Sequence, residues 1–278
     1  MHHNNQKKIA VINDYSGFGR CSIAVAMPII SYLGIQCCPV PTSIFSNHTG
    51  FPEFFFDDYT DRMQEYIDNW KKLELRFSGI MTGFLGSKEQ IDIVKKFIED
   101  FRDDNTTIIV DPAMGENGKP YPTYTKEMCD EMKRLTEYAD IITPNLTECC
   151  MLTGTEYKPE GWKKEELYNM AQKLLCFGAK KVVISGVHMG RYIGNVIGEA
   201  DKKPRIIKHE KTGDYRSGTG DIYAAIIAAD SINRVDFESS VRKAAGFVKK
   251  AVAATERLKI PSTDGLAFEE VLYTLKRD

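Results

Sequence analysis

The most distinctive chemistry in this sequence lies in residues 213–225, which read Gly-Asp-Tyr-Arg-Ser-Gly-Thr-Gly-Asp-Ile-Tyr-Ala-Ala. Small residues at 217–220 precede an apolar helical pattern that starts at Ile222. A phosphate could therefore approach the free N–H groups and the positive dipole end of that helix. A carboxylate at Asp221 would repel the phosphate unless it takes part in the reaction, for instance as the base that accepts a proton from an attacking hydroxyl. The stretch predicts phosphoryl transfer to an alcohol, with helix capping as the alternative role of Asp221.

Polar residues also follow several other apolar runs. The run Ala10–Ile12 leads into residues 13–19, Asn-Asp-Tyr-Ser-Gly-Phe-Gly, and two further runs end in Asp111-Pro112 and in Thr143-Pro144-Asn145. Each of these alone fits an ordinary turn. Ligands of parallel sheets bind beyond the carboxyl ends of the strands, so several such ends together favour a site at that edge.

Strand-like and helical patterns alternate along the chain, which predicts an α/β fold with a mostly parallel central sheet flanked by helices on both faces. We interpret residues 1–278 as one domain with a disordered tail at 1–7. The expected strands are Ile9–Ile12, Cys37–Val40, Gly79–Met81, Thr107–Val110, Ile141–Thr143, Lys181–Ser185 and Ile193–Ile197. The expected helices are 22–33, 57–72, 87–102, 125–137, 163–177, 220–232, 237–254 and 266–276.

Composition narrows the class of protein. The net charge of −2 gives no electrostatic reason to expect a nucleic-acid or membrane partner, and no apolar run approaches the length of a bilayer span. The N-terminus lacks the apolar core of a signal peptide, so we expect the cytoplasm. The seven cysteines include no Cys-x-x-Cys pair, which favours buried free thiols over a redox or zinc site.

Other nucleotide-binding motifs are absent or incomplete. The only Gly-Lys pair, Gly118-Lys119, precedes Pro120, so there is no P-loop. Residues 17–22 approach the dinucleotide fingerprint, but Ser22 replaces its last glycine and no acid follows at the ribose position, which leaves a nicotinamide enzyme as a weak alternative. The protein-kinase signatures are also missing.

Five segments together resemble the pyridoxal (vitamin B6) kinase family of the ribokinase superfamily. They are Ser-Gly-Thr-Gly-Asp at 217–221, Phe-Ser-Asn-His-Thr-Gly at 45–50, Thr-Gly-Phe-Leu-Gly-Ser at 82–87, Asp-Pro-Ala-Met-Gly at 111–115, and Ala-Asp-Ile-Ile-Thr-Pro-Asn at 139–145 with Glu148. The resemblance covers about residues 8–255. It implies a ribokinase-like kinase that uses ATP and Mg²⁺, with K⁺ as a further candidate cofactor, to phosphorylate a B6 vitamer, and it implies a homodimer.

The resemblance also implies roles for single residues. Asp221 would be the catalytic base, and the N–H groups of Gly218, Thr219 and Gly220 would form the anion hole. Asp111 and Glu148 would lie near Mg²⁺. The substrate would contact Asp14, Ser16, Asn47, Thr49, Phe84 and Asp221. ATP would contact Asp111, Thr143, Asn145, Glu148, Ser185 and Ser217. Residues 116–125 would be a flap over ATP, with a plain surface loop as the alternative.

Two residues depart from the family pattern. Asp14 stands where serine is usual, so we hypothesise that it pairs with a pyridine nitrogen or an amine and shifts the vitamer preference. Phe84 replaces a frequent tyrosine, which removes a hydroxyl and keeps the ring. We interpret His48 as structural rather than catalytic.

Three alternative functions stay open. A hydroxymethylpyrimidine kinase would share the fold and the base, and a sugar kinase is less consistent because no strand-rich lid follows the first strand. A non-catalytic nucleotide or B6-binding protein would not need the three carboxylates together.

Overall fold

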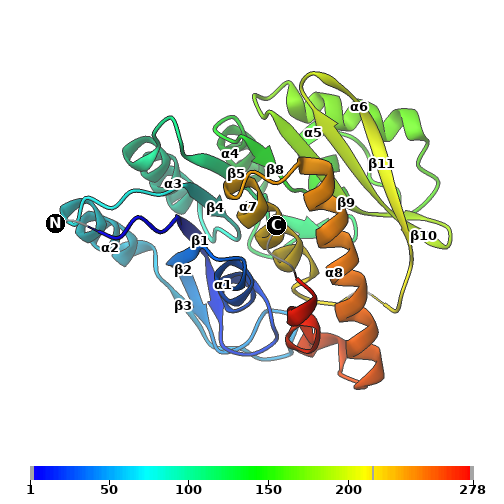
Figure 1. Cartoon of the computed structure of the whole chain (residues 1–278), viewed down its shortest axis with the longest axis horizontal. Helices are drawn as coiled ribbons and strands as arrows, with labels where there is room; N and C mark the ends of the chain where they lie inside the picture. The colour runs from blue at the N-terminus through cyan, green and yellow to red at the C-terminus, as the bar shows by residue number, and fades with distance from the viewer. Residues whose placement is uncertain (1–2, 215, 276–278) are drawn as a thin grey trace.

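A nine-stranded sheet forms the centre of the molecule, in the order β11-β10-β9-β8-β5-β4-β1-β2-β3 (Figure 1). The computed structural model describes residues 3–214 and 216–275. The strands of this sheet are β1 (Lys8–Ser16), β2 (Gln36–Phe45), β3 (Phe56–Asp58), β4 (Gly79–Thr82), β5 (Thr107–Val110), β8 (Ile141–Ile142), β9 (Lys181–Met189), β10 (Tyr192–Glu199) and β11 (Lys202–Glu210). A separate hairpin pairs β6 (Gly115–Glu116) with β7 (Lys119–Pro120).

The six central strands, β2, β1, β4, β5, β8 and β9, are parallel, whereas β3, β10 and β11 join as antiparallel strands at the two ends. The register pairs Ile12 with Thr82 and Thr82 with Val110, so the pairing of β1 with β4 and of β4 with β5 ends at one level of the sheet. The predicted α/β fold with a mostly parallel sheet is confirmed.

Helices cover both faces of the sheet and enclose two apolar cores (Figure 1). One core lies under α1, α7, α8 and the 3₁₀ segment η2, and the other under α2 to α6. Helix α7 is buried along nearly its whole length, since it is apolar on all sides. The helices are α1 (Ser22–Tyr32), α2 (Thr60–Lys72), α3 (Lys88–Phe101), α4 (Lys126–Thr136), α5 (Leu146–Thr153), α6 (Lys164–Leu175), α7 (Thr219–Ile232) and α8 (Phe237–Arg257), with 3₁₀ turns η1 (Ser262–Asp264) and η2 (Phe268–Thr274).

Several elements differ from the sequence-based expectation. Residues 266–275 of the predicted helix 266–276 contain the 3₁₀ turn η2 in place of an α-helix, and residue 276 lies outside the described residues. Strand β11 was not predicted because its lysines and arginine obscure the alternation, as is common in edge strands. Helix α5 was not predicted because it has only 8 residues, too few to display a helical period.

Residues 1–2 of the predicted tail 1–7 lie outside the described residues, whereas His3 places its Nε2 2.8 Å from the carbonyl oxygen of Leu73. The single-domain interpretation stays a prediction. In the described part of the chain, none of the helices combines the length and apolar character that a membrane crossing needs.

The seven cysteines are free thiols, as expected from the sequence. Cys21, Cys149 and Cys150 are buried, as expected. Three others, Cys37, Cys38 and Cys129, are only partly buried, and Cys176 is exposed, so the expectation that all seven are buried is wrong.

Candidate active site

Residues 217–220, Ser-Gly-Thr-Gly, form a narrow turn at the start of α7, at the carboxyl edge of the sheet. We call these four residues the glycine turn. Gly218 is the N-cap residue, with φ of +78°, and a β-carbon there would lie 1.9 Å from the carbonyl oxygen of Arg20. The hydroxyl of Thr219 donates to the carbonyl of Arg216 at 2.7 Å, which closes the turn. Gly220 is exposed, and a β-carbon there would have no other atom within 4 Å. The first N–H groups of a helix have no partner within it, so this turn can bind an anion.

Asp221 follows this turn directly and is half-buried. Burial raises the pKa of its carboxyl, while hydrogen bonds from the Ser22 backbone N–H and the Asn13 side chain oppose the rise. The Nδ2 of Asn13 lies 3.5 Å from Oδ1 of Asp221. A carboxylate with a raised pKa beside an anion site is suited to accept a proton near neutral pH.

Asn13, which we did not single out from the sequence, orients this carboxylate. Its Oδ1 accepts hydrogen bonds from the backbone N–H of Phe84 at 2.8 Å and of Asp14 at 2.9 Å, so the amide NH₂ must face Asp221. A β-carbon at Gly83 would lie 2.4 Å from the Asn13 amide. Gly83 therefore leaves the space that Asn13 occupies.

Three carboxyls act on one another electrostatically across the site. Burial and the charge of Asp221 raise the pKa of Asp111, and burial and the charge of Asp111 raise the pKa of Glu148 well above its usual range. Within residues 3–214 and 216–275, no salt bridge to lysine or arginine involves these three carboxyls. A cation near these carboxyls would therefore stabilise their ionised forms.

The predicted nucleotide residues lie around this cluster. Asn145 and Glu148 form a capping box at the start of α5, with Asn145 Oδ1 accepting from the Glu148 N–H at 2.9 Å and Glu148 Oε2 accepting from the Asn145 N–H at 2.7 Å. Thr143 donates to Asp111 at 3.0 Å. Ser185 forms an isolated parallel bridge with Asn145, so it lies beside them. Ser217 is half-buried in the turn before α7.

Asp14 is buried below the site rather than open to a ligand. Its two oxygens accept the hydroxyls of Ser22 at 2.6 Å and Ser16 at 3.0 Å. Burial raises its pKa to about 6, and the charge of Asp221 adds to the rise. Since both oxygens already have donors, this geometry gives no support to a direct pair between Asp14 and a substrate amine.

Replacing Asp14 with asparagine should raise stability more at pH 7.5 than at pH 4.5. The native carboxyl, with its pKa of about 6, binds its proton more tightly than an unfolded one at 3.8. The free energy of unfolding therefore falls as pH rises through this window, by up to about 3 kcal/mol. Thermal unfolding of Asp14→Asn and of exposed Asp201→Asn at both pH values checks this. An equal shift in Tm for Asp14→Asn at the two pH values would contradict it.

The loop after β2 combines aromatic rings with internal hydrogen bonds. Asn47 donates to the carbonyl of Glu53 at 2.8 Å, His48 is half-buried, and Thr49 lies exposed in the turn. Phe84 is half-buried, with its ring centroid 6.3 Å from those of Phe45 and Tyr124. These rings give the edge of the sheet an apolar wall next to Asp221.

The predicted flap is a small hairpin connected to α5. The side chain of Asn145 donates to the carbonyl of Gly115 at 2.9 Å, and the N–H of Gly118 donates to Thr147 at 2.9 Å. Burial and the charges of Glu148, Glu116, Asp221 and Asp111 raise the pKa of Tyr121. Tyr121 belongs to the segment predicted as a flap, in which no sequence pattern singled out one residue.

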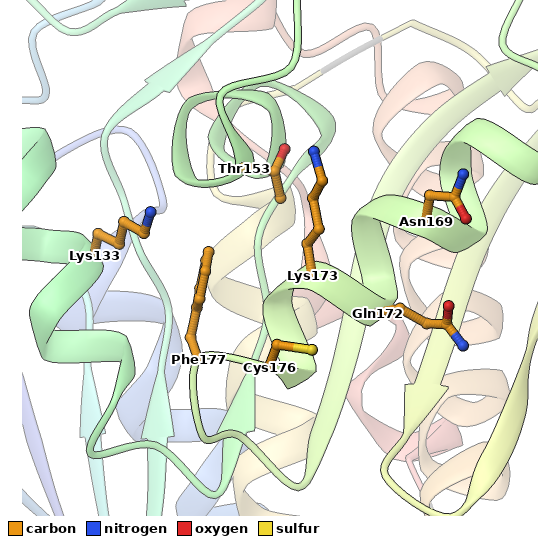
Figure 2. Close-up of a pocket in the computed structure, with 7 residues that line it drawn as sticks. All are labelled: Lys133, Thr153, Asn169, Gln172, Lys173, Cys176 and Phe177. Carbon is orange, nitrogen blue, oxygen red and sulfur yellow. The ribbon is translucent and has the colours of Figure 1, made fainter.

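A separate cavity lies among α4, α5 and α6 (Figure 2). Lys133, Thr153, Asn169, Gln172, Lys173, Cys176 and Phe177 line it. It contains none of the three carboxyls and none of the glycine turn, so it is distinct from the candidate active site.

A parallel sheet whose edge brings an anion-binding helix start together with a raised-pKa carboxylate is the arrangement of a kinase with the ribokinase-like fold. The chain belongs to the phosphomethylpyrimidine kinase family, whose sequence profile matches residues 30–265.

Relatives agree with this placement. A candidate phosphomethylpyrimidine kinase from Bacteroides thetaiotaomicron, solved with pyridoxal, is 36% identical, with a TM-score of 0.93 over 98% of this chain and 96% of that one. Pyridoxal kinase from Arabidopsis thaliana is 31% identical over 71% of this chain, and the match spans 65% of the Arabidopsis enzyme. Pyridoxal kinase from Leishmania donovani, in complex with ADP and ginkgotoxin, is 19% identical, with a TM-score of 0.89 over 97% of this chain and 96% of that one, and shows the fold alone.

Proposed function

We propose that the protein transfers the γ-phosphoryl group of ATP to the 5′-hydroxymethyl group of a vitamin B6 vitamer. The observation that carries the proposal is the position of Asp221, next to the glycine turn and oriented by Asn13. The backbone N–H of Phe84 donates to the same Asn13. The half-buried ring of Phe84 supplies a flat apolar surface for a heteroaromatic ring. The pyridoxal bound to the Bacteroides relative supports this choice of acceptor.

In the proposed reaction Asp221 accepts the proton of the substrate hydroxyl. The hydroxyl oxygen forms a bond to the γ-phosphorus as the bond from that phosphorus to the β–γ bridging oxygen breaks, and ADP leaves. The N–H groups of Gly218, Thr219 and Gly220 stabilise the charge on the transferring group. Such transfers depend mainly on positioning and charge neutralisation, which these groups supply.

The donor set fits Mg²⁺. Three mutually repelling carboxyls without a salt bridge in the described chain would be stabilised by a divalent cation. The described residues contain no group of three or more His, Cys, Asp or Glu side chains that could hold a metal ion alone. Mg²⁺ is typically held by one or two carboxylates with water and phosphate oxygens. We assign Asp111 and Glu148 to hold it, directly or through water, where it would neutralise phosphate charge.

A hydroxymethylpyrimidine is the second candidate acceptor. The family description, and the name of the Bacteroides relative, both refer to phosphomethylpyrimidine kinases. Hydroxymethylpyrimidine has a flat ring and a primary alcohol, which could use the same base, Asp221, and the same aromatic ring, Phe84.

ADP release with ATP and Mg²⁺ tests the proposal against pyridoxal, pyridoxine, pyridoxamine, hydroxymethylpyrimidine and ribose. We expect turnover on a B6 vitamer. Turnover on hydroxymethylpyrimidine alone would move the protein to the second candidate, and the absence of turnover on all five with ATP bound would contradict both. The vitamer ranking of Asp14→Ser, measured in the same assay, tests whether Asp14 sets the preference.

We extend the proposal to the assembly, the ions and the compartment. Phe54, Phe55 and Phe56 are exposed in and beside the edge strand β3, which supports a homodimer formed through this edge. Light scattering measures whether the protein is a dimer.

From the family resemblance we propose K⁺ as an activator, tested by turnover in potassium and tetramethylammonium salts. The free thiols support the cytoplasm.

A further inference from the structure

Three loops of the candidate site attach to one short segment that follows α8. We call residues 258–264, which come directly after α8, the C-terminal segment. Each loop reaches it through a side chain that donates to a backbone carbonyl of the segment. The donors come from the turn before α7, the loop after β2 and the loop between β1 and α1, which are far apart in sequence.

Arg216 connects the glycine turn to the C-terminal segment. Its side chain is 10% exposed, with Nη1 donating to the carbonyl of Ile260 at 2.8 Å and Nη2 donating to Glu256 at 2.7 Å. The Arg216 guanidinium lowers the pKa of Glu256. The carbonyl of Arg216 accepts the Thr219 hydroxyl at 2.7 Å, so the same residue holds the segment and the predicted anion hole.

His48 connects the loop after β2 to the same segment. Its Nδ1 accepts the N–H of Gly50 at 3.0 Å, so the ring proton must be on Nε2, which lies 2.6 Å from the carbonyl oxygen of Thr263. The tautomer is therefore fixed by two backbone contacts. Both ring nitrogens are occupied, which assigns His48 a positioning role and no proton transfer.

Arg20 connects the third loop. Its Nη1 donates to the carbonyl of Asp264 at 3.0 Å, and its Nε bonds to Glu269 at 2.8 Å. The backbone of this loop also packs closely against two glycines. A β-carbon at Gly218, in the glycine turn, would lie 1.9 Å from the carbonyl oxygen of Arg20. A β-carbon at Gly265, just after the C-terminal segment, would lie 2.4 Å from the carbonyl oxygen of Gly19. The loop is enclosed between the glycine turn and the chain that follows the C-terminal segment.

We infer that the C-terminal segment fixes the relative positions of the anion hole, the substrate loop and the β1–α1 loop, with Arg216 and His48 as positioning residues. The consequence for turnover rests on the proposed function, whereas the attachment itself does not. Misplacement of reacting groups by about 1 Å can cost about 100-fold in rate. Loss of one attachment should therefore reduce kcat more than it changes KM.

The experiment combines kinetics with hydrogen exchange on the full chain. Arg216→Met should lower kcat about 10- to 100-fold, with KM for ATP and for the vitamer changed less than about threefold. Amide exchange should accelerate in peptides covering 216–221 and 260–264 but not in those covering β4 and β5. In the double variant with His48→Ala, the loss of kcat should be smaller than the product of the two single losses, since one segment serves both loops.

Arg257→Met is the matched control. Arg257 lies at the end of α8, next to Glu256, and pairs with Glu270 rather than with a residue of the three loops. Arg216→Lys, which keeps the charge, should recover part of the exchange protection and covers the case in which Arg216→Met fails to fold. Unchanged exchange at 216–221 in both Arg216 variants, or kcat equal to that of Arg257→Met, would overturn the inference. If the unaltered protein turns over none of the acceptors, the proposed function fails, while the exchange data still decide whether the segment holds the loops.

Discussion

Replacing Asp221 with asparagine should lower kcat for the preferred acceptor by about 10²- to 10⁴-fold, the usual contribution of a positioned general base. The carboxamide is nearly the same size as the carboxylate, and its oxygen can still accept from Asn13 and from the Ser22 N–H. The fold and ATP binding should therefore persist. Only the capacity to accept the hydroxyl proton is lost.

ADP release under saturating ATP and vitamer measures this effect, and calorimetric titration with ATP checks that the nucleotide still binds. Asp201→Asn provides the control, since Asp201 is exposed in the turn before β11. A variant at position 221 that keeps more than about a tenth of the original kcat would exclude Asp221 as the base. It would leave helix capping as the residue's role.

Substituting Gly218 with alanine is the second change with a large expected effect. The residue has φ of +78°, and a β-carbon would meet the carbonyl oxygen of Arg20 at 1.9 Å, so the backbone must move. The left-handed conformation costs a non-glycine residue roughly 1–2 kcal/mol in addition. Removal of one anion-hole donor lowers kcat by about 10²- to 10³-fold in other enzymes, and we expect a loss of that order.

Gly246→Ala is the matched control because Gly246 lies within α8 with no atom within 4 Å of a β-carbon. Alanine there should keep the activity and raise stability by up to about 1 kcal/mol. Steady-state kinetics and thermal unfolding of both variants separate the two effects. Activity in Gly218→Ala equal to that in Gly246→Ala would show that the turn does not bind the transferring phosphoryl group.

The sequence correctly predicted those helices and strands whose apolar residues recur at a regular local spacing. Strand Thr107–Val110 and the helix over 87–102 carry continuous apolar periods, and both occur in the structure within a residue of their predicted ends. Strand Lys202–Glu210 was missed because its lysines and arginine obscure the alternation and because its pairing depends on β10, a contact that no local pattern encodes.

In the candidate site, too, residues with a local signal could be predicted, and residues whose role depends on distant contacts could not. Asp221 could be selected because it follows a glycine-rich turn, whereas Asp111 and Glu148 were selected because their segments resemble those of the pyridoxal kinase family. The capping box of Asn145 and Glu148 was also readable from their spacing of three, although we interpreted both residues only as ligands. Asn13 could not be assigned its role, since its orientation depends on the backbone of Phe84, 71 positions away.

The attachments to the C-terminal segment could not be predicted for a related reason. Their acceptors are carbonyl oxygens, which every residue carries, so Ile260, Thr263 and Asp264 give no signal in the sequence. From the sequence, the region after residue 237 was accordingly predicted only as the helices 237–254 and 266–276.

The two edges of the central sheet have opposite characters, which limits the assemblies that the chain can form. The sheet ends in β11 on one side and in β3 on the other (Figure 1). Strand β11 presents Lys202, Lys203 and Lys208 to solvent, and the exposed phenylalanines lie in and beside β3. Lysines on an edge strand oppose the addition of another strand, whereas the exposed phenylalanines at the β3 edge, beside Asp57 and Asp58, favour contact with another apolar surface. Two copies joined through β3 would present only charged edges outward, so growth would stop at a closed pair and would not continue into a filament.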